Sequence, residues 1–217
     1  MNDESISAPG VTDAAVSPEG PSFSVRMRAR DLLNVAIFAV IYLFVSYAMI
    51  MPGLISPLIF VVALLLGVIV CSIPYLLFLT RVKHGGMVTL FGVVLGLVFA
   101  LSGYGWIAFA LTVLVSVAAE VILWFGRYRS QRAAIGAYTV FALSSAAPFV
   151  PLVIDREAYF TSSAVSGQTP EYVEAMEQIL TLPVVWGYFG ATLVCGLLGA
   201  LLGIVLLKKH FVRAGLA

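Results

Sequence analysis

Three charged residues stand together where a long apolar stretch of the chain ends. Asp155, Arg156 and Glu157 follow this stretch and precede two aromatic residues, Tyr159 and Phe160. A pair of carboxylates can act as acid and base in catalysis, whereas mixed charges beside aromatic rings can bind a ligand. Charged residues also mark the point where a helix leaves a membrane. The rest of the sequence has to distinguish these three interpretations.

The catalytic interpretation lacks the partner groups that it requires. The two histidines, His84 and His210, lie in basic segments far from Asp155 in the sequence. The motifs HExxH, GxSxG and GxxxxGK[ST] are absent from the sequence, which argues against a zinc protease, a serine hydrolase or a P-loop site. Cys71 and Cys195 stand alone in apolar runs without metal-ligand spacing. We therefore expect a protein that is not an enzyme and that holds no cofactor and no metal.

The amino-acid composition assigns the chain to a membrane. Of 217 residues, 61% are hydrophobic and 11% are charged, and the mean hydropathy is +1.06. A membrane-spanning helix needs about 20 mostly apolar residues. Six apolar runs approach or exceed this length: 32–50, 57–79, 86–101, 106–125, 133–153 and 183–207. We predict an all-α integral membrane protein, a bundle of six transmembrane helices.

The distribution of basic residues predicts the orientation of the bundle. Eleven of the twelve Lys and Arg precede the first run, follow the last, or lie between runs two and three or four and five. The positive-inside rule makes these segments, and with them both termini, cytoplasmic. Arg156 is the exception, so the loop 155–182 that contains it is predicted to be extracellular. We expect a multi-pass protein of the plasma membrane.

The segment 1–25 differs from the rest of the chain. It is rich in Ser, Pro, Gly and Ala, and it contains acidic residues but no Lys or Arg. This composition predicts a disordered cytoplasmic tail ahead of a membrane domain over 26–217.

The extracellular loop carries the pattern of a short amphipathic helix. Thr169 can cap such a helix, with Pro170 at its first position. Its apolar stripe would consist of Val173, Met176 and Leu180. We predict that this helix lies over the outer mouth of the bundle.

Two prolines, Pro148 and Pro151, lie near the end of the fifth apolar run. Because proline lacks an amide hydrogen and clashes with the preceding turn, we expect the outer end of this helix to be loosened. Backbone groups exposed in this way are tolerated at membrane depth only against protein or a wet cavity.

Tyr104 and Trp106 lie at the start of the fourth run, beside Gly103 and Gly105. Aromatic residues at such a position commonly anchor a helix at the membrane surface. Alternatively, the two rings form a stacking wall for a ligand, because the glycines make a tight loop and permit close backbone approach. Both interpretations stay open.

Glu120 is the one acidic residue inside an apolar run, where burying a carboxylate is costly. Arg127 follows two turns later, near the predicted cytoplasmic surface. We interpret Glu120 as a packing or snorkelling residue, with a role in proton transfer or energy coupling as the alternative.

Small residues recur along two of the predicted helices and would let helix backbones approach closely. The last run carries five glycines that we expect to pack inside the bundle: Gly187, Gly190, Gly196, Gly199 and Gly203. The first run carries Ala36 and Ala39 beside the polar Asn34, a pattern that fits either the bundle interior or contact with a second membrane protein.

Six stretches, taken in order, carry a family resemblance: RDLLNVAIFAVIYLFVSY, LTRVKHGGMVTLFGVVLGL, GYGWIAF, AEVILWFGRYRS, PFVPLVIDREAYF and LLGALLGIVLLKKHFVRAGLA. Together they resemble the MptD or Trep_Strep family of membrane proteins, over about residues 28 to 217. Members are assigned as substrate-binding S components of energy-coupling factor (ECF) transporters.

The resemblance implies a six-helix bundle that captures a scarce micronutrient outside the cell. Such a bundle works with a transmembrane T component and two ABC ATPases, and it topples in the membrane to release its cargo inward. The absence of a P-loop motif from this sequence fits a complex in which separate subunits hydrolyse ATP. S components commonly present an AxxxA surface to the T component; here Asn34, Ala36 and Ala39 would take that place, with AxxA spacing.

The resemblance leaves the substrate open between a vitamin-like molecule and a flat tetrapyrrole such as haem. No histidine lies outside the predicted cytoplasmic segments, which disfavours cobalt and nickel. For the same reason haem iron would need Tyr159, Met49 or Met51 as its ligands.

We predict a non-enzymatic substrate-capture subunit with its site in the outer half of the bundle. Asp155, Arg156 and Glu157 would supply charge, and the stacking area would come from Tyr159, Phe160, Tyr104 and Trp106. The alternatives are a structural or assembly membrane protein that binds an extracellular partner, and a small secondary transporter. No internal repeat or pair of broken helices supports the transporter.

Overall fold

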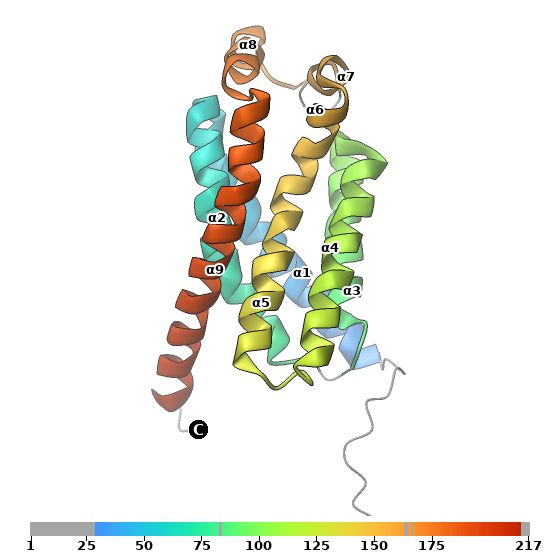
Figure 1. The fold of residues 1–217 in the computed structure, drawn as a ribbon, viewed down its shortest axis with the longest axis vertical. Helices are drawn as coiled ribbons and strands as arrows, with labels where there is room; N and C mark the ends of the chain where they lie inside the picture. The colour runs from blue at the N-terminus through green and yellow to red at the C-terminus, as the bar shows by residue number, and fades with distance from the viewer. Residues whose placement is uncertain (1–28, 83, 163–164, 166, 214–217) are drawn as a thin grey trace, which may run out of the picture.

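The chain folds into a bundle of helices, described by a computed structural model (Figure 1). The structure describes residues 29–82, 84–162, 165 and 167–213, the side chains of 210–213 excepted, and these residues form no strand. The predicted tail 1–25 lies outside the described residues. Because lipid offers the backbone no hydrogen bonds, helices that satisfy their own backbone groups are the structure that this composition requires.

The elements follow the predicted apolar runs closely. In chain order they are α1 (Ala29–Ile50), η1 (Met51–Leu54), α2 (Pro57–Leu79), α3 (Met87–Phe99), η2 (Ala100–Tyr104), α4 (Gly105–Phe125), α5 (Gln131–Phe141), η3 (Ala142–Phe149), α6 (Val150–Ile154), α7 (Arg156–Phe160), α8 (Pro170–Ile179) and α9 (Leu182–Arg213). The run predicted at 57–79 coincides with α2.

Five stretches of the described residues are long and apolar enough to cross a membrane: Ala29–Leu54, Pro57–Leu79, Met87–Phe125, Gln131–Ile154 and Leu182–Lys209. The third has 39 residues and contains two of the predicted runs. It doubles back on itself, because α3 and α4 lie side by side and are joined through η2 (Figure 1).

Glycines make the reversal between α3 and α4 possible. Gly103 has φ of 95° and Gly105 has φ of 77°, a left-handed conformation that residues with a side chain rarely adopt. Farther along, a Cβ at Gly92 would collide with the side chain of Ser116, so the two helices approach closely because Gly92 has none. The tight loop predicted here is confirmed.

The fifth run changes helix type before it ends. It is α-helical to Phe141, continues as the 3-10 helix η3, which contains Pro148, and Pro151 then lies in the first turn of α6. In a 3-10 helix each amide pairs with the carbonyl three residues earlier, and Pro148 has no amide hydrogen for that of Ser145. The predicted loosening of this helix is confirmed.

Three of the five glycines on α9 pack inside the bundle: Gly196, Gly199 and Gly203. A Cβ at Gly199 would lie 3.0 Å from Cα of Ile69 on α2, a backbone atom that cannot move aside freely. A Cβ at Gly187 or Gly190 would meet nothing within 4 Å. The prediction of internal packing is confirmed for the first three glycines and is wrong for these two.

Aromatic rings fill the middle of the bundle. Tyr75 on α2 stacks on Phe141 of α5 with ring centroids 4.5 Å apart, and Phe78 stacks on Phe91 of α3 at 4.8 Å. All four side chains are buried. Since lipid is as apolar as these rings, close packing rather than escape from water favours this arrangement.

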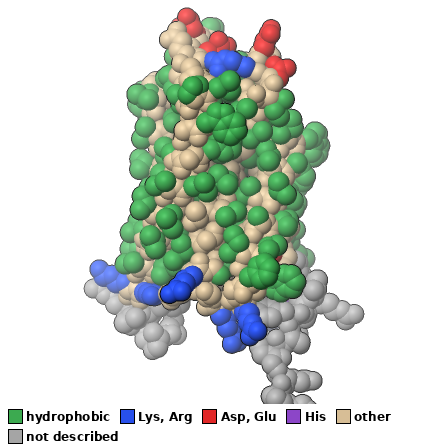
Figure 2. All heavy atoms as spheres, viewed as in Figure 1, with side chains coloured by type: hydrophobic (Ala, Val, Ile, Leu, Met, Phe, Trp, Pro, Cys, Tyr) green, Lys and Arg blue, Asp and Glu red, His purple; other side chains and the backbone are tan. Residues whose placement is uncertain are grey.

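Charged side chains gather at the two ends of the bundle, and hydrophobic side chains cover the surface between them (Figure 2). The basic end carries Arg81, Arg127, Arg129, Arg132, Lys208 and Lys209. The acidic end carries Asp155, Glu157, Glu171, Glu174 and Glu177, with Arg156 among them. An apolar girdle between two charged ends is the surface that a multi-pass membrane protein requires.

Candidate functional site

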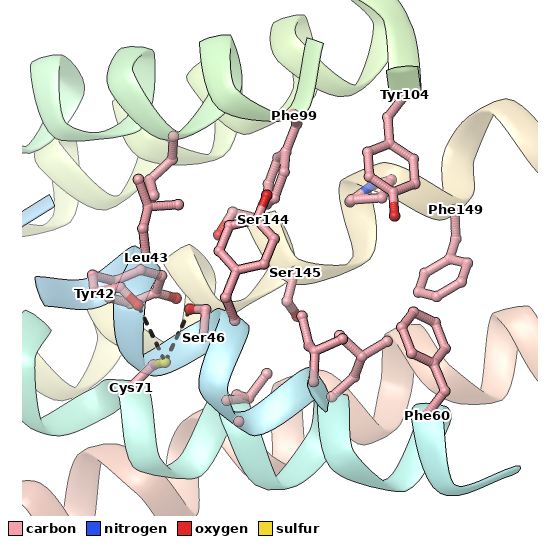
Figure 3. A pocket seen from close by; sticks show the side chains of 17 residues that line it. Tyr42, Leu43, Ser46, Phe60, Cys71, Phe99, Tyr104, Ser144, Ser145 and Phe149 are labelled. Carbon is pink, nitrogen blue, oxygen red and sulfur yellow. Dashed lines mark hydrogen bonds between the residues drawn. The ribbon is translucent and has the colours of Figure 1, made fainter. Parts of the chain in front are cut away.

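A cavity of about 140 Å³ lies in the half of the bundle near the acidic end (Figure 3). Its walls come from the second half of α1, the first half of α2, the end of α3 with η2, and η3. Among the residues that the structure describes, none of those that line it carries a charge. Segments far apart in the sequence therefore enclose an uncharged space.

Aromatic rings form much of the cavity wall: Tyr42, Tyr47, Phe60, Phe99, Tyr104 and Phe149. Phe60 and Phe149 meet edge to face with centroids 6.5 Å apart, and Phe99 and Tyr104 do so at 6.3 Å. Edge-to-face pairs favour one relative ring orientation. The wall therefore presents aromatic rings in defined orientations to the cavity.

Hydroxyl and thiol groups provide the polar part of the wall. Ser46 Oγ lies 3.2 Å from Cys71 Sγ, and Ser145 Oγ donates to the carbonyl of Ala142 at 2.8 Å. Ser144 also lines the cavity and is 2% exposed. These residues were not among the predicted binding residues, because no motif or spacing in the sequence marks them. The nearest signal was the pair of prolines that loosens this helix.

Tyr47 marks the place where the cavity reaches the protein surface. It lines the cavity, yet it is 44% exposed. Its hydroxyl lies 3.3 Å from Ser102 Oγ on η2. This contact joins α1 to η2 beside the cavity.

The two aromatic residues that flank Gly105 point in different directions. Tyr104 lines the cavity, whereas Trp106 is 71% exposed and rests edge to face on Phe109, with centroids 5.7 Å apart. Gly105, which stands between them, has φ of 77°, so the chain leaves helical geometry there and the two side chains leave the loop in different directions. The geometry gives Tyr104 the position of a stacking wall and Trp106 that of a membrane-surface residue.

Two of the three charged residues at 155–157, Asp155 and Arg156, bind the protein's own backbone. Asp155 Oδ1 accepts from the amide of Ala158 at 2.9 Å and caps α7. Arg156 Nη1 donates to the carbonyl of Leu180 at 2.5 Å, and Nη2 donates to that of Glu177. These carbonyls lie at the C-terminal end of α8, where they have no partner within the helix and where a cation is favourable.

The remaining predicted residues lie outside the cavity wall. Tyr159 and Phe160 are buried in an apolar cluster with Met176 of α8, and Glu157 is exposed. Burial raises the pKa of the Tyr159 hydroxyl well above its ordinary value, so this group stays neutral. Of the seven residues predicted to bind substrate, Tyr104 alone lines this cavity.

Helix α8 closes the acidic end, and its predicted cap and apolar stripe are confirmed. Thr169 Oγ1 accepts from the amide of Tyr172 at 3.3 Å, and Pro170 is the first helical residue. The Tyr172 hydroxyl donates to the carbonyl of Gly53 at 2.8 Å, which ties α8 to η1. Met176 is buried beneath the helix. We call α7 and α8 together the lid.

At the basic end, Glu120 caps a neighbouring helix. Its Oε1 accepts from the amide of Gly86 at 2.9 Å and from the hydroxyl of Tyr128 at 2.6 Å, and its Oε2 accepts from the amide of Thr89 at 2.7 Å. Both amides belong to the start of α3, the positive end of its dipole. The geometry supports a structural role, in keeping with the packing interpretation.

A second carboxylate, which no sequence motif marks, contacts a histidine at the basic end. Asp31, at the start of α1, is 6% exposed, and its Oδ2 lies 3.0 Å from Nδ1 of His84. His84 belongs to the loop between α2 and α3, which also provides Gly86 to Glu120. Asp31 on α1 and Glu120 on α4 thus both contact the loop between α2 and α3.

The residues predicted to contact a T component do not share one face of α1. Ala39 is fully buried, Ala36 is exposed and Asn34 is half-buried. Ala39 follows the buried Val35 by one turn, whereas Ala36 lies one turn before the exposed Val40. Of the two alanines, only Ala36 therefore lies on the exposed face of α1.

The described residues hold no group of three or more His, Cys, Asp or Glu that could bind a metal ion. The residues considered as haem ligands do not line the cavity either. Tyr159 is buried with the lid, Met51 is 61% exposed, and Met49 is half-buried on α1.

These features define an all-helical multi-pass membrane protein with an aromatic-lined cavity in the half of the bundle that carries the lid. A family model described as "Hypothetical bacterial integral membrane protein (Trep_Strep)" matches residues 29–213. The chain belongs to this family. Neither the curated proteins nor the solved structures provide a match.

Proposed function

We propose that this chain is the substrate-binding S component of an ECF-type importer in the plasma membrane, and that the cavity holds its substrate. The observation that carries the proposal is the cavity itself. It is lined by aromatic rings and hydroxyls, it lies in the half of the bundle near the acidic end, and three residues of its wall, Phe60, Tyr104 and Phe149, pack in the same apolar cluster as the lid. Ligand sites have these properties, whereas a purely structural bundle has no need of them.

Six crossings follow if the two arms of Met87–Phe125 each cross once. Helices α3 and η2 contribute 13 and 5 residues and α4 contributes 21, at about 1.5 Å each, close to the hydrocarbon core of about 30 Å. Both termini then belong to the basic end, which the positive-inside rule assigns to the cytoplasm. The lid and the cavity face outward under this topology.

The chain would depend on partners for energy. It has no ATP-binding motif, so a T component and two ABC ATPases would drive transport, and the chain itself would not be an enzyme. The exposed face of α1 around Ala36 is the place proposed for the T component, because small residues permit close helix contact.

Co-purification in mild detergent tests this proposal. The expected result is that the tagged chain brings down one polytopic T component and two ATPases, and that uptake of its ligand requires ATP hydrolysis. Ala36→Leu should reduce recovery of the partners, while the matched change Ala39→Leu, on the buried face, should instead reduce folding. A folded preparation that repeatedly carries neither ATPase would contradict the proposal and favour a scaffold.

A further inference from the structure

We propose that the cavity selects an uncharged, flat compound of about the size of one aromatic ring. This inference rests on the proposed function, because it specifies the substrate class of the same site. Three observations carry it: the volume of the cavity, the absence of charge from its lining, and the way in which the nearby charges are already bonded.

The volume limits the ligand to about one ring. The cavity measures about 140 Å³, and an apolar cavity of about 150 Å³ in another protein binds benzene. A porphyrin contains four five-membered rings joined in one plane and exceeds this space. Haem is therefore excluded from the cavity in the conformation described here.

The lining excludes a net charge on the ligand. Within the described part of the chain, it contains rings, aliphatic side chains, serines and one cysteine, but no Asp, Glu, Lys, Arg or His. Moving an ion out of water into such surroundings is strongly unfavourable without an opposite charge. Aromatic faces attract cations, but this attraction is weaker than the lost hydration.

The charges of the acidic end do not compensate for this lack. Asp155 accepts from the amide of Ala158, and Arg156 donates to the carbonyls of Leu180 and Glu177. Releasing either group for a ligand would leave helix ends without partners. Glu157, Glu171, Glu174 and Glu177 are exposed and do not line the cavity, so a charged ligand finds no counter-ion among the described residues of the cavity wall.

The serines indicate what the ring carries. Ser46 and Ser144 lie on different elements, α1 and η3, and each hydroxyl can donate one hydrogen bond and accept two. A neutral amide, carbonyl or ring nitrogen satisfies such groups, and the rings of Phe60 and Phe149 cover its faces. The class is a small neutral aromatic or heteroaromatic compound.

Three probes of nearly the same shape test the inference: benzamide, which is neutral, benzoate, an anion, and benzamidinium, a cation. The measurement is the thermal unfolding midpoint of the purified full chain at millimolar probe. We expect benzamide to raise the midpoint by about 3 °C near saturation and the two ions to raise it by less than a third of that.

Two variants connect the effect to the cavity. Ser46→Leu fills part of the space and should abolish the shift. If this variant fails to fold, Leu64→Phe, which fills the cavity from α2, should abolish it. Phe44→Leu, on the exposed face of α1, should keep the full shift. The inference is overturned if either ion stabilises the protein as strongly as benzamide, or if no probe stabilises the wild type more than the filled variant. Recovery of the T component and ATPases is measured separately, so the proposed function can stand when the substrate class fails.

Discussion

The carboxylate of Glu120 on α4 and the amide of Thr89 on α3 are joined by a hydrogen bond of 2.7 Å. Together with Gly86, this contact places a negative charge at the amino-terminal end of α3. Glu120 therefore has a structural role within its apolar run, because it accepts hydrogen bonds from amides at the start of α3 that have no partner within that helix.

Replacing Glu120 with Gln should lower the free energy of unfolding by about 2 kcal/mol, because hydrogen bonds to a charged group contribute about 1.5–3 kcal/mol. Unfolding in detergent measures the loss. Glu157→Gln, on the exposed lid, is the matched control and should change little. Normal stability with lost uptake would instead support the proton or coupling role.

Tyr128 should make the protein sensitive to alkali. Its burial and its hydrogen bond to Glu120 raise its pKa above the ordinary 10.0. Below about pH 10 the Tyr128 hydroxyl is protonated in both the folded and the unfolded chain, and its full contribution to the free energy of unfolding is present. Above this pH the unfolded chain loses the proton first, so the folded state becomes less stable relative to it. Tyr128→Phe should be less stable than the wild type at pH 8, and the difference should narrow toward about pH 11. Unfolding midpoints across this range measure it, and a constant difference would contradict the assignment.

Arg156→Ala should loosen the lid. The loss of two hydrogen bonds to carbonyls at the end of α8 should increase amide exchange over 170–179 by about tenfold and should speed ligand release. Hydrogen exchange with mass spectrometry measures the first effect. Arg132→Ala, at the basic end, provides the control. Unchanged exchange combined with lost affinity would mean that Arg156 touches the ligand directly, as the sequence-based hypothesis held.

Tyr104→Ala and Trp106→Ala should differ in their effect on ligand affinity. Removal of the cavity-lining ring should weaken binding about 5-fold to 10-fold, a typical loss for one aromatic contact, while removal of the exposed ring should leave it unchanged. Titration with the ligand recovered on purification, or with benzamide, measures both. Equal losses of ligand affinity in the two variants would indicate that Trp106 also contacts the ligand.

Gly199→Ala should destabilise the bundle, and Gly190→Ala should not. The added Cβ at 199 meets the backbone of Ile69 at 3.0 Å, and such overpacking costs about 1–3 kcal/mol, whereas the same atom at 190 enters open space. There alanine should be neutral or gain up to about 1 kcal/mol through its helix propensity. Unfolding in detergent compares the two. A stable Gly199→Ala protein would show that α9 can move away from α2.

Local features were read correctly from the sequence. The apolar runs set the helices, because a backbone in lipid must bond to itself within each run. Thr169 with Pro170 set the start of α8, and the glycines at 103 and 105 set the reversal between α3 and α4, because caps and left-handed turns depend on a few adjacent residues.

The site required the tertiary structure. In a soluble helix the apolar stripe shows which side faces the core, but in a membrane helix the core side and the lipid side are both apolar. Ala36 and Ala39, or Tyr104 and Trp106, therefore cannot be assigned to faces from the sequence, and the serines of η3 cannot be placed opposite Ser46. Likewise Arg156 was predicted to bind a ligand because its partners cannot be read from the sequence. The carbonyls that it binds belong to residues more than twenty positions away. The sequence by itself determined a membrane-spanning helical chain and its local turns; packing among the helices decided where the cavity lies and which side chains line it.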